Sequence, residues 1–329
     1  MFMSKFQTLG RKIFRVVSNQ DNGLTVLCYH RVMNYLKPGQ FPNLVVNCSP
    51  ESFENEICFL MKHYNIISIE KAVEGLQSGN TLPPGSLGIT FDDGYKDNYT
   101  NVFPILKKYE LAATIFLTTD FIDNDKNLIW TDRVTYLIDN TKRRFVDIPG
   151  LGYHSLTNKR QKEGAKINII EGLKEMNSGE KDKIIESLHK ELAVEIKNDI
   201  AKGVYLSSGE IFEMNKSNIS FGSHGCSHSI LTKINLDEAR LEIINSKKKI
   251  EQITCKKVKF FAYPNGTPFD FNSEIIEILK TAGYEAAFTT IYGVNRKGAN
   301  LDMFSLKRIL TGKSLQGLMK NLFMLKIKG

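Results

Sequence analysis

The amino-acid sequence predicts an α/β protein, a distorted (β/α) barrel of seven or eight parallel strands with a helical insertion. Three observations lead to this prediction. Short apolar runs rich in β-branched and aromatic residues alternate with segments whose apolar residues recur every three or four positions, the pattern of parallel strands joined by covering helices. Seven or eight such repeats favour closure into a barrel over an open sheet. Residues 121–206 interrupt the alternation with a charged stretch of helical periodicity, which indicates an inserted helical subdomain.

Each element follows from its local pattern of apolar residues. The strands are expected at the short apolar runs, which are residues 24–29, 65–69, 87–91, 112–117, 219–223, 258–263, 285–290 and 304–310. The covering helices are expected where apolar residues recur at helical spacing, at residues 51–64, 97–109, 236–253 and 273–282. The same spacing predicts helices of the insertion at residues 165–176 and 179–196.

The positive charge of the chain is concentrated near its two ends. The 329 residues include 44 Lys or Arg and 36 Asp or Glu, for a net charge of +8. The excess lies in residues 1–20 and 307–329, which contain no acidic residue. A nucleic-acid-binding protein would more often carry a basic stripe on its folded body, so no nucleic-acid partner is expected. We therefore divide the chain into a basic segment (1–20), the barrel with its insertion (21–310) and a second basic segment (311–329).

Both basic segments have an amphipathic pattern that admits two interpretations. The apolar side chains recur at helical spacing, as Phe2, Phe6, Leu9, Ile13 and Val17 in the first segment and as Leu315, Leu318, Met319 and Leu322 in the second. In one interpretation, each apolar stripe packs on the barrel while the charges stay in water. In the other, the segments dock on an anionic membrane surface as peripheral contacts.

The sequence also predicts a cytoplasmic protein, with peripheral contact at the inner face of the membrane left open. Arg15 divides the apolar residues of the first segment, and no uncharged apolar run approaches the roughly 18 residues of a membrane span, so neither a signal peptide nor a transmembrane segment is expected. The five cysteines are odd in number and lack Cys-x-x-Cys spacing, which indicates a reducing compartment without a disulfide framework.

Reactive residues follow four of the predicted strands directly. The active-site groups of a (β/α) barrel lie at the C-terminal ends of its strands. The residues found there are His30, Asp92, Asp93, His224, His228, Tyr263, Pro264 and Asn265. Taken singly, each has a structural alternative, because a histidine at a strand end is often only hydrogen-bonded and Asp-Asp-Gly is a common turn sequence. Their convergence on one face favours an active site.

The residue types at these strand ends suit hydrolysis at a metal ion. Two histidines four residues apart and a carboxylate from another strand provide three ligands for one divalent ion, zinc being favoured and cobalt or nickel also compatible. Such an ion lowers the pKa of a coordinated water toward about 7. Of Asp92 and Asp93, one can bind the metal while its neighbour takes a proton, and His30 is placed to protonate a leaving amine.

The motifs resemble those of the polysaccharide deacetylase family, which is carbohydrate esterase family 4 or the NodB homology domain. The first two motifs are matched by Thr90-Phe91-Asp92-Asp93-Gly94 and by Ser223-His224-Gly225-Cys226-Ser227-His228. The resemblance covers most of residues 24–310 apart from the insertion. It implies a metal-dependent hydrolase that removes acetyl groups from N-acetylated sugars.

The resemblance also implies roles for single residues. Asp93, His224 and His228 would be the metal ligands, and Asp92 the catalytic base. The third motif is expected at Phe261-Ala262-Tyr263-Pro264-Asn265-Gly266, where the backbone N–H near Asn265 would stabilise the oxyanion. Tyr263, Pro264 and Trp130 are the expected substrate-binding residues.

The sequence departs from the family pattern at three places. Ala262 replaces the arginine that usually holds the base carboxylate, so control of the pKa of Asp92 must come from elsewhere. The usual C-terminal histidine motif is absent from residues 304–308, but Val26-Leu27-Cys28-Tyr29-His30-Arg31 resembles that strand relocated by circular permutation, which makes His30 the expected acid. The insertion is similar to the Trp-x-Asp-Arg segment of deacetylases found with cell-surface polysaccharide synthesis, and it begins with Trp130, Asp132 and Arg133.

The role of Trp130 and the function of the site each admit alternatives. Trp130 either walls the acetyl pocket or stacks on a sugar, or else it anchors the insertion on the barrel. The favoured function is removal of acetyl groups from the N-acetylated sugars of a cell-surface polysaccharide or its lipid-linked precursor. The same site also suits an O-acetyl esterase or a small-amide hydrolase, and a barrel that binds glycan or scaffolds a complex without catalysis is the non-enzymatic alternative.

Overall fold

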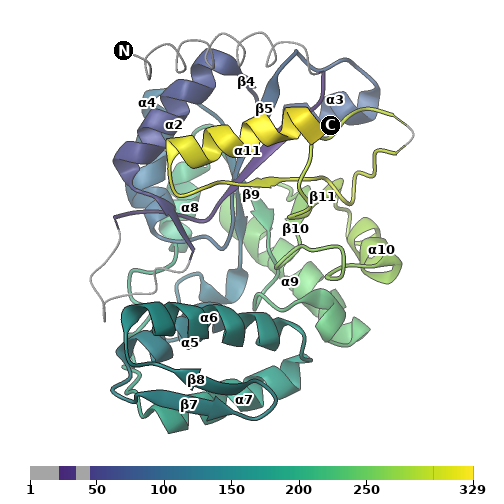
Figure 1. Ribbon diagram of the computed structural model, residues 1–329. Helices are drawn as coiled ribbons and strands as arrows, with labels where there is room; N and C mark the ends of the chain where they lie inside the picture. Colours follow the sequence, from purple (N-terminus) through teal and green to yellow (C-terminus); the bar gives the residue numbers. More distant parts are fainter. Residues whose placement is uncertain (1–21, 35–44, 299, 329) are drawn as a thin grey trace, which may run out of the picture.

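The main sheet of the protein is a curled set of parallel strands, seen in a computed structural model that describes residues 22–34, 45–298 and 300–328 (Figure 1). The strand order is β11-β10-β9-β6-β5-β1-β12, with β4 paired to β5 beside this path. The strands are β1 (Thr25–Tyr29), β4 (Asn65–Ile66), β5 (Ser86–Phe91), β6 (Ala113–Leu117), β9 (Ile219–Ser223), β10 (Phe260–Ala262), β11 (Ala286–Phe288) and β12 (Ile309–Leu310). The prediction of a distorted (β/α) barrel is confirmed, and each predicted strand overlaps one of these.

The first and last strands of the sheet are neighbours. β1 pairs with β12 on one side, with Leu27 opposite Ile309, and with β5 on the other, with Tyr29 opposite Phe91. All residues of β1 and β5 are buried, as expected for parallel strands covered on both faces. Segments far apart in sequence therefore meet at this edge of the sheet.

Helices cover the sheet much as the apolar spacing predicts. Residues 97–109 form a π-helical turn followed by a helix, and the helices at residues 69–78 and 208–214 were not predicted. The helices of the barrel are α2 (Pro50–His63), α3 (Ile69–Ser78), η1 (Asn98–Val102), α4 (Phe103–Lys108), η2 (Thr119–Phe121), α8 (Ser208–Met214), η3 (Leu231–Lys233), α9 (Leu236–Thr254) and α10 (Ser273–Thr281). β2 (Arg31–Val32) and β3 (Val46–Cys48) form a small separate sheet.

The insertion packs around a hydrophobic cluster of its own at one end of the molecule (Figure 1). Its elements are α5 (Trp130–Asn140), β7 (Phe145–Ile148), β8 (Gly152–Ser155), α6 (Lys159–Lys174) and α7 (Ser178–Leu192). The two helices predicted in this stretch are present as α6 and α7. The antiparallel hairpin β7-β8 was not expected, although the alternating exposure of residues 145–148 is the pattern of a half-buried strand.

The C-terminal basic segment forms α11 (Leu315–Lys328), which lies against α2 (Figure 1). Leu318 and Leu322 of the predicted apolar stripe are fully buried in the main core, and Lys320 is exposed. For this helix the packing interpretation is therefore favoured over membrane docking. The N-terminal segment with Phe2, Phe6, Leu9, Ile13 and Val17 lies outside the described residues.

Within residues 22–34, 45–298 and 300–328, no helix is both long enough and apolar enough to span a bilayer. All five cysteines fall within these ranges, and none of them forms a disulfide.

Glu56 on α2 is a buried carboxyl in the core beneath β1. Its Oε2 accepts a hydrogen bond from the Tyr29 hydroxyl at 2.9 Å, and its Oε1 has no hydrogen-bond partner among the described residues. Burial raises the pKa of Glu56 from 4.5 to about 7. The folded protein therefore holds this proton at pH values where the unfolded chain has released it.

The free energy of unfolding is expected to depend on pH through Glu56. The protonated carboxyl of Glu56 contributes fully to the free energy of unfolding below pH 4.5. This contribution is lost as the pH rises through about 7, because the folded state binds the proton more tightly than the unfolded chain does. Relative to wild type, Glu56→Gln should be more stable at pH 8 than at pH 4.5 by up to about 3 kcal/mol, measured by urea unfolding. The control Glu54→Gln, on the same helix, should show a small change of opposite sign, because Lys108 lowers the pKa of Glu54. An identical difference for Glu56→Gln at both pH values would contradict this assignment.

Candidate metal and catalytic centre

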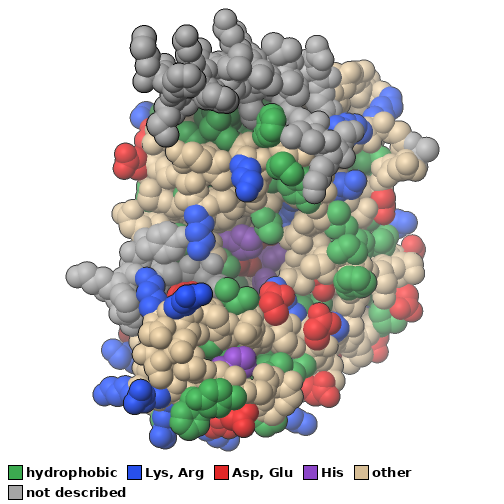
Figure 2. Space-filling view, in the orientation of Figure 1, with side chains coloured by type: hydrophobic (Ala, Val, Ile, Leu, Met, Phe, Trp, Pro, Cys, Tyr) green, Lys and Arg blue, Asp and Glu red, His purple; other side chains and the backbone are tan. Residues whose placement is uncertain are grey.

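The predicted strand ends meet in one cavity of about 400 Å³. Asp92 and Asp93 follow β5, His224 follows β9, and His30 follows β1, so four reactive side chains come from three strands. Figure 2 shows histidine side chains at the centre of this face, between the barrel and the insertion. The cavity therefore joins the catalytic candidates named from the sequence.

Asp93, His224 and His228 form a compact group of metal-ligand atoms. Asp93 Oδ1 lies 3.5 Å from His224 Nε2 and 3.3 Å from His228 Nε2. Ligands held about 2.1 Å from a tetrahedral zinc ion are about 3.4 Å apart, so this spacing suits three atoms that share one ion. The two imidazole rings lie 5.0 Å apart and nearly perpendicular, with interplanar angle 74°.

The surroundings of these three residues also suit a metal ion. Asp93 Oδ1 is buried and has no hydrogen-bond partner among the described residues, which is costly unless a cation binds it. His224 Nδ1 lies 2.7 Å from the carbonyl oxygen of Ala262; donating its proton there directs the Nε2 lone pair at the group. Burial lowers the pKa of His224 to about 4, which keeps the imidazole neutral and able to bind metal.

Backbone conformation and a second carboxylate hold the ligand loops in place. Asp93 and His228 have positive φ angles of 72° and 63°, an uncommon conformation for residues other than glycine that often occurs at functional sites. Glu242 on α9 accepts hydrogen bonds from the backbone N–H of Cys226 and of Ser227, at 2.6 and 3.0 Å. Glu242 thus fixes the turn between the two histidines, a role that the sequence analysis did not assign.

Arg308 holds the carboxylate of Asp92 and controls its pKa, a role that the methyl side chain of Ala262 cannot perform. Its Nη1 and Nη2 donate to Asp92 Oδ1 and Oδ2 at 2.7 and 2.8 Å, and both side chains are buried. Burial raises the pKa of Asp92, but the coulombic effect of Arg308 outweighs it together with that of His224, so the net pKa lies well below its ordinary value. Asp92 is therefore held ionised in a fixed orientation.

The charge of Arg308 was counted with the basic residues 307–329, although the residue lies in the last predicted strand, and the structure shows that it belongs to the core. Arg308 is fully buried and also donates from Nε to the carbonyl oxygen of Thr289 at 2.9 Å. One signal was available: Leu306 and Arg308 are two residues apart in a predicted strand, so they share the inward face.

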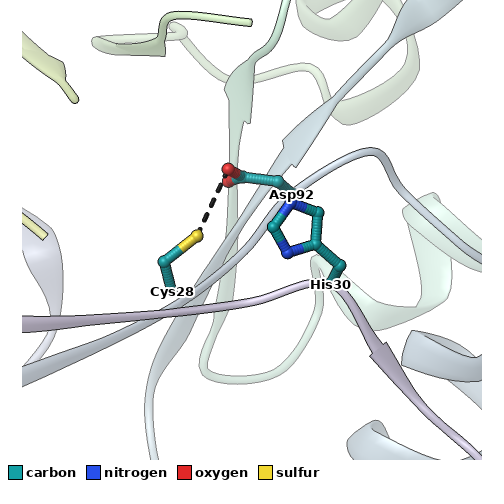
Figure 3. Close-up of side chains that lie close together, drawn as sticks. All are labelled: Cys28, His30 and Asp92. Carbon is teal, nitrogen blue, oxygen red and sulfur yellow. Dashed lines mark hydrogen bonds between the residues drawn. The ribbon is translucent and has the colours of Figure 1, made fainter. Parts of the chain in front are cut away.

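His30 lies beside Asp92 at the end of β1, and Cys28 lies on the other side of the carboxylate (Figure 3). The Cys28 thiol donates to Asp92 Oδ2 at 3.4 Å. The backbone of His30 is fixed by Asn47, which accepts from its N–H at 2.7 Å, and by Asn98, which donates to its carbonyl at 2.9 Å. Cys28, His30 and Asp92 are also close enough for a metal ion, but Arg308 already binds both oxygens of Asp92, so Asp93 is the better carboxylate ligand.

The third-motif residues lie partly in the cavity. Tyr263 and Asn265 line it, whereas Pro264 is buried and does not. Asn265 has a φ angle of 64°, and its side chain donates to Asp270 at 2.7 Å. Its backbone N–H has no hydrogen-bond partner among the described residues and is available for an oxyanion.

Trp130 has contacts with both the cavity and the barrel. It lines the cavity, and its indole N–H donates to the carbonyl oxygen of His228 at 3.3 Å. Next to it, Asp132 accepts from the hydroxyls of Tyr95 and Tyr205 at 2.9 and 2.8 Å, which ties the start of the insertion to the barrel. Arg133 pairs with Glu186 at 2.8 Å on the surface of the insertion.

Helix α6 of the insertion also forms one wall of the cavity, which the sequence did not predict. Ile167, Ile170, Glu171 and Lys174 of α6 line it opposite the strand ends. The remaining histidines, His63, His154 and His189, do not line this cavity.

Three comparisons place the chain among known proteins. A family model described as polysaccharide deacetylase matches residues 79–169 and 188–287. The chain is 22% identical over 229 residues to YxkH of Bacillus subtilis (strain 168), covering 70% of this chain and 52% of that protein. It is 30% identical over 112 residues to the poly-β-1,6-N-acetyl-D-glucosamine N-deacetylase of Staphylococcus epidermidis, covering 31% of this chain and 38% of that enzyme. The chain thus spans about half the length, or less, of these relatives.

Solved structures share the fold at low sequence identity. The Streptococcus pyogenes deacetylase PplD, in complex with acetate, has a TM-score of 0.59 and 17% identity, with 92% of this chain and 98% of that one covered. IcaB from Ammonifex degensii has a TM-score of 0.58 and 20% identity, with 92% and 97% covered. At this identity the likeness shows the fold alone.

Proposed function

Because the chain belongs to the polysaccharide deacetylase family, we propose that it removes acetyl groups from the N-acetylated sugars of a cell-surface polysaccharide or its precursor, with one divalent metal ion. The observation that carries the proposal is the compact group of buried Asp93, buried His224 and partly buried His228 beside Asp92. Zinc fits two neutral imidazoles and one carboxylate best, and cobalt or nickel are compatible. A relative of the same family is named for N-deacetylation of poly-β-1,6-N-acetyl-D-glucosamine.

The metal would be held by Asp93, His224 and His228. A divalent ion supplies Lewis acidity there, since it polarises a carbonyl and makes water more acidic. Asp92 takes the proton of the attacking water, and Arg308 keeps its carboxylate aimed at the cavity. The unpartnered N–H of Asn265 donates to the oxyanion that develops on the acetyl oxygen. His30, beside Asp92, gives a proton to the departing amine.

The function is tested by acetate release from an N-acetylglucosamine oligomer. Wild type is stripped with a chelator, reloaded with zinc and assayed beside O-acetylated sugars and simple acyl amides. Activity that disappears with the metal, returns with zinc and favours the N-acetylated sugar supports the proposal. Preference for an ester or a small amide would replace the substrate class, and absence of any acyl release with metal bound would favour the binding or scaffold alternative.

Asp92→Asn is expected to keep its metal and lose turnover. The amide fills the same volume but cannot take a proton, and loss of a general base costs about 10²–10⁴-fold in rate. Metal content by elemental analysis and kcat for the oligomer are the two measurements. Asp237→Asn, the same chemical change at an exposed position of α9, is the control and should leave turnover and metal content unchanged. Normal turnover by Asp92→Asn would show that another group is the base.

A further inference from the structure

Two large apolar side chains lie half exposed at the mouth of the catalytic cavity. Ile167 of α6 is 53% exposed and Leu310 of β12 is 47% exposed, and both line the cavity that contains the metal-ligand group. They come from opposite sides, one from the insertion and one from the barrel. In Figure 2, hydrophobic side chains border the central histidines on both sides. Exposed apolar surface next to a reactive site is typical of a binding surface.

The aromatic residues that line the cavity do not offer a free face for stacking on a sugar. Trp130 is 9% exposed, and Lys181 Nζ lies 4.8 Å from the centre of its ring. Tyr263 is buried and stacks on Phe271, with ring centres 4.5 Å apart. The mouth of the cavity therefore presents aliphatic side chains where a polysaccharide site would more often present an aromatic platform.

The two charged residues of α6 that line the cavity leave its mouth mainly apolar. Glu171 and Lys174 are one turn apart on α6 and pair with each other at 2.7 Å. Their charges therefore offset each other, and the apolar contacts dominate the mouth.

Depth in the cavity determines which part of a substrate meets these side chains. The side chains of His224 and Asp93 are 2% and 5% exposed, so the reacting acetamido group must enter to the buried end. Ile167 and Leu310 are at the exposed end, and they therefore face what is attached to the far side of the sugar.

We propose that the mouth formed by Ile167 and Leu310 binds an apolar chain attached to the sugar as its aglycone, so that the substrate is an N-acetylated sugar linked to a lipid. The inference rests on the proposed deacetylation, and it narrows the substrate from a free glycan to a lipid-linked one.

The test compares the octyl and methyl β-glycosides of N-acetylglucosamine, each below any micelle-forming concentration. Wild type is expected to have a kcat/KM for the octyl glycoside at least about 10-fold higher, because even one methylene in an apolar site changes kcat/KM by about 10-fold or more. The ratio should fall toward one in the double variant Ile167→Ser and Leu310→Ser. It should persist at high salt, because apolar contacts are not screened. Leu241→Ser on α9, an exposed leucine away from the cavity, should leave the ratio unchanged.

The experiment tests the apolar subsite and the proposed deacetylation with two different readouts. Acetate release from either glycoside reports deacetylation, and only the octyl to methyl ratio reports the apolar subsite. A ratio near one in wild type, or equal losses on both glycosides in the double variant, would overturn the inference while deacetylation stands. A preference for N-octanoyl over N-acetyl in the methyl glycoside would place the chain on the acyl side and also overturn it. If neither glycoside is hydrolysed, binding of the two to Asp92→Asn by calorimetry gives the same ratio without turnover.

Discussion

Replacing His228 with alanine is expected to remove the bound metal and acetate release together. His228 Nε2 is one of three ligand atoms clustered around Asp93 Oδ1, and two remaining ligands hold a divalent ion poorly. Even residues that only orient ligands cost 10–100-fold in metal affinity when changed, so we expect a loss of more than about 100-fold. Elemental analysis should fall from about one ion per chain to a small fraction of that value.

A thermal measurement checks the same loss independently of turnover. Added zinc should raise the melting temperature of wild type, because an ion that binds only the folded state stabilises it. The rise should be absent in His228→Ala and in Asp93→Asn. His154→Ala is the matched control, since that imidazole lies in the insertion and bonds the carbonyl oxygen of Leu151 instead. Full metal content in either ligand variant would refute the assigned ligand set.

Replacing Arg308 with methionine is expected to lower both the turnover and the free energy of unfolding. The change leaves the carboxylate of Asp92 buried without its two hydrogen bonds from the guanidinium, and breaking a buried pair costs about 3–5 kcal/mol. Turnover should fall at least about 100-fold, because the base loses its fixed orientation. Arg308→Lys keeps the charge without the two-point contact, so it should lie between wild type and Arg308→Met in both quantities.

The double variant Asp92→Asn and Arg308→Met measures how far the effects of the two single changes depend on each other. If the two side chains act together, the cost of the second change is smaller in the background of the first, in stability and in rate. Lys307→Met is the control, because it removes a positive charge at the neighbouring exposed position, whereas Asp92 pairs with Arg308. Additive effects of the two single changes would mean that Arg308 does not act through Asp92.

The fold could be predicted because it depends on a pattern repeated along the whole chain. The runs at residues 87–91 and 219–223 become β5 and β9 with the same boundaries within one residue. Strands read from weaker patterns were predicted too long, and residues 65–69 contribute only β4 before Ile69 begins α3. Local periodicity fixes where an element occurs, but hydrogen bonding to its neighbours decides where it ends.

The reactive residues of the site could be predicted because each lies directly after a strong strand. The residues that position them could not, for physical reasons that differ. Arg308 directly precedes β12 and is fully buried, yet a count of charges by segment groups it with the basic tail. Glu242 lies within a helix of ordinary amphipathic sequence, and only the packing of α9 against β9 brings it to the turn between His224 and His228. Ile167 reaches the cavity only through the placement of the insertion.

The bond between Arg308 and Asp92 has a consequence for how the molecule becomes active during folding. It joins residues that are 216 positions apart in sequence. The strand between them in the sheet is β1, which pairs with β5 just before Asp92 and with β12 just after Arg308. Closing a loop of that length is slow and is repaid only when the flanking strands are already aligned. The two imidazoles, in contrast, are four residues apart in sequence, so bringing them together closes only a short loop. We therefore expect catalytic activity to return late in refolding, when β1 pairs with β5 and β12.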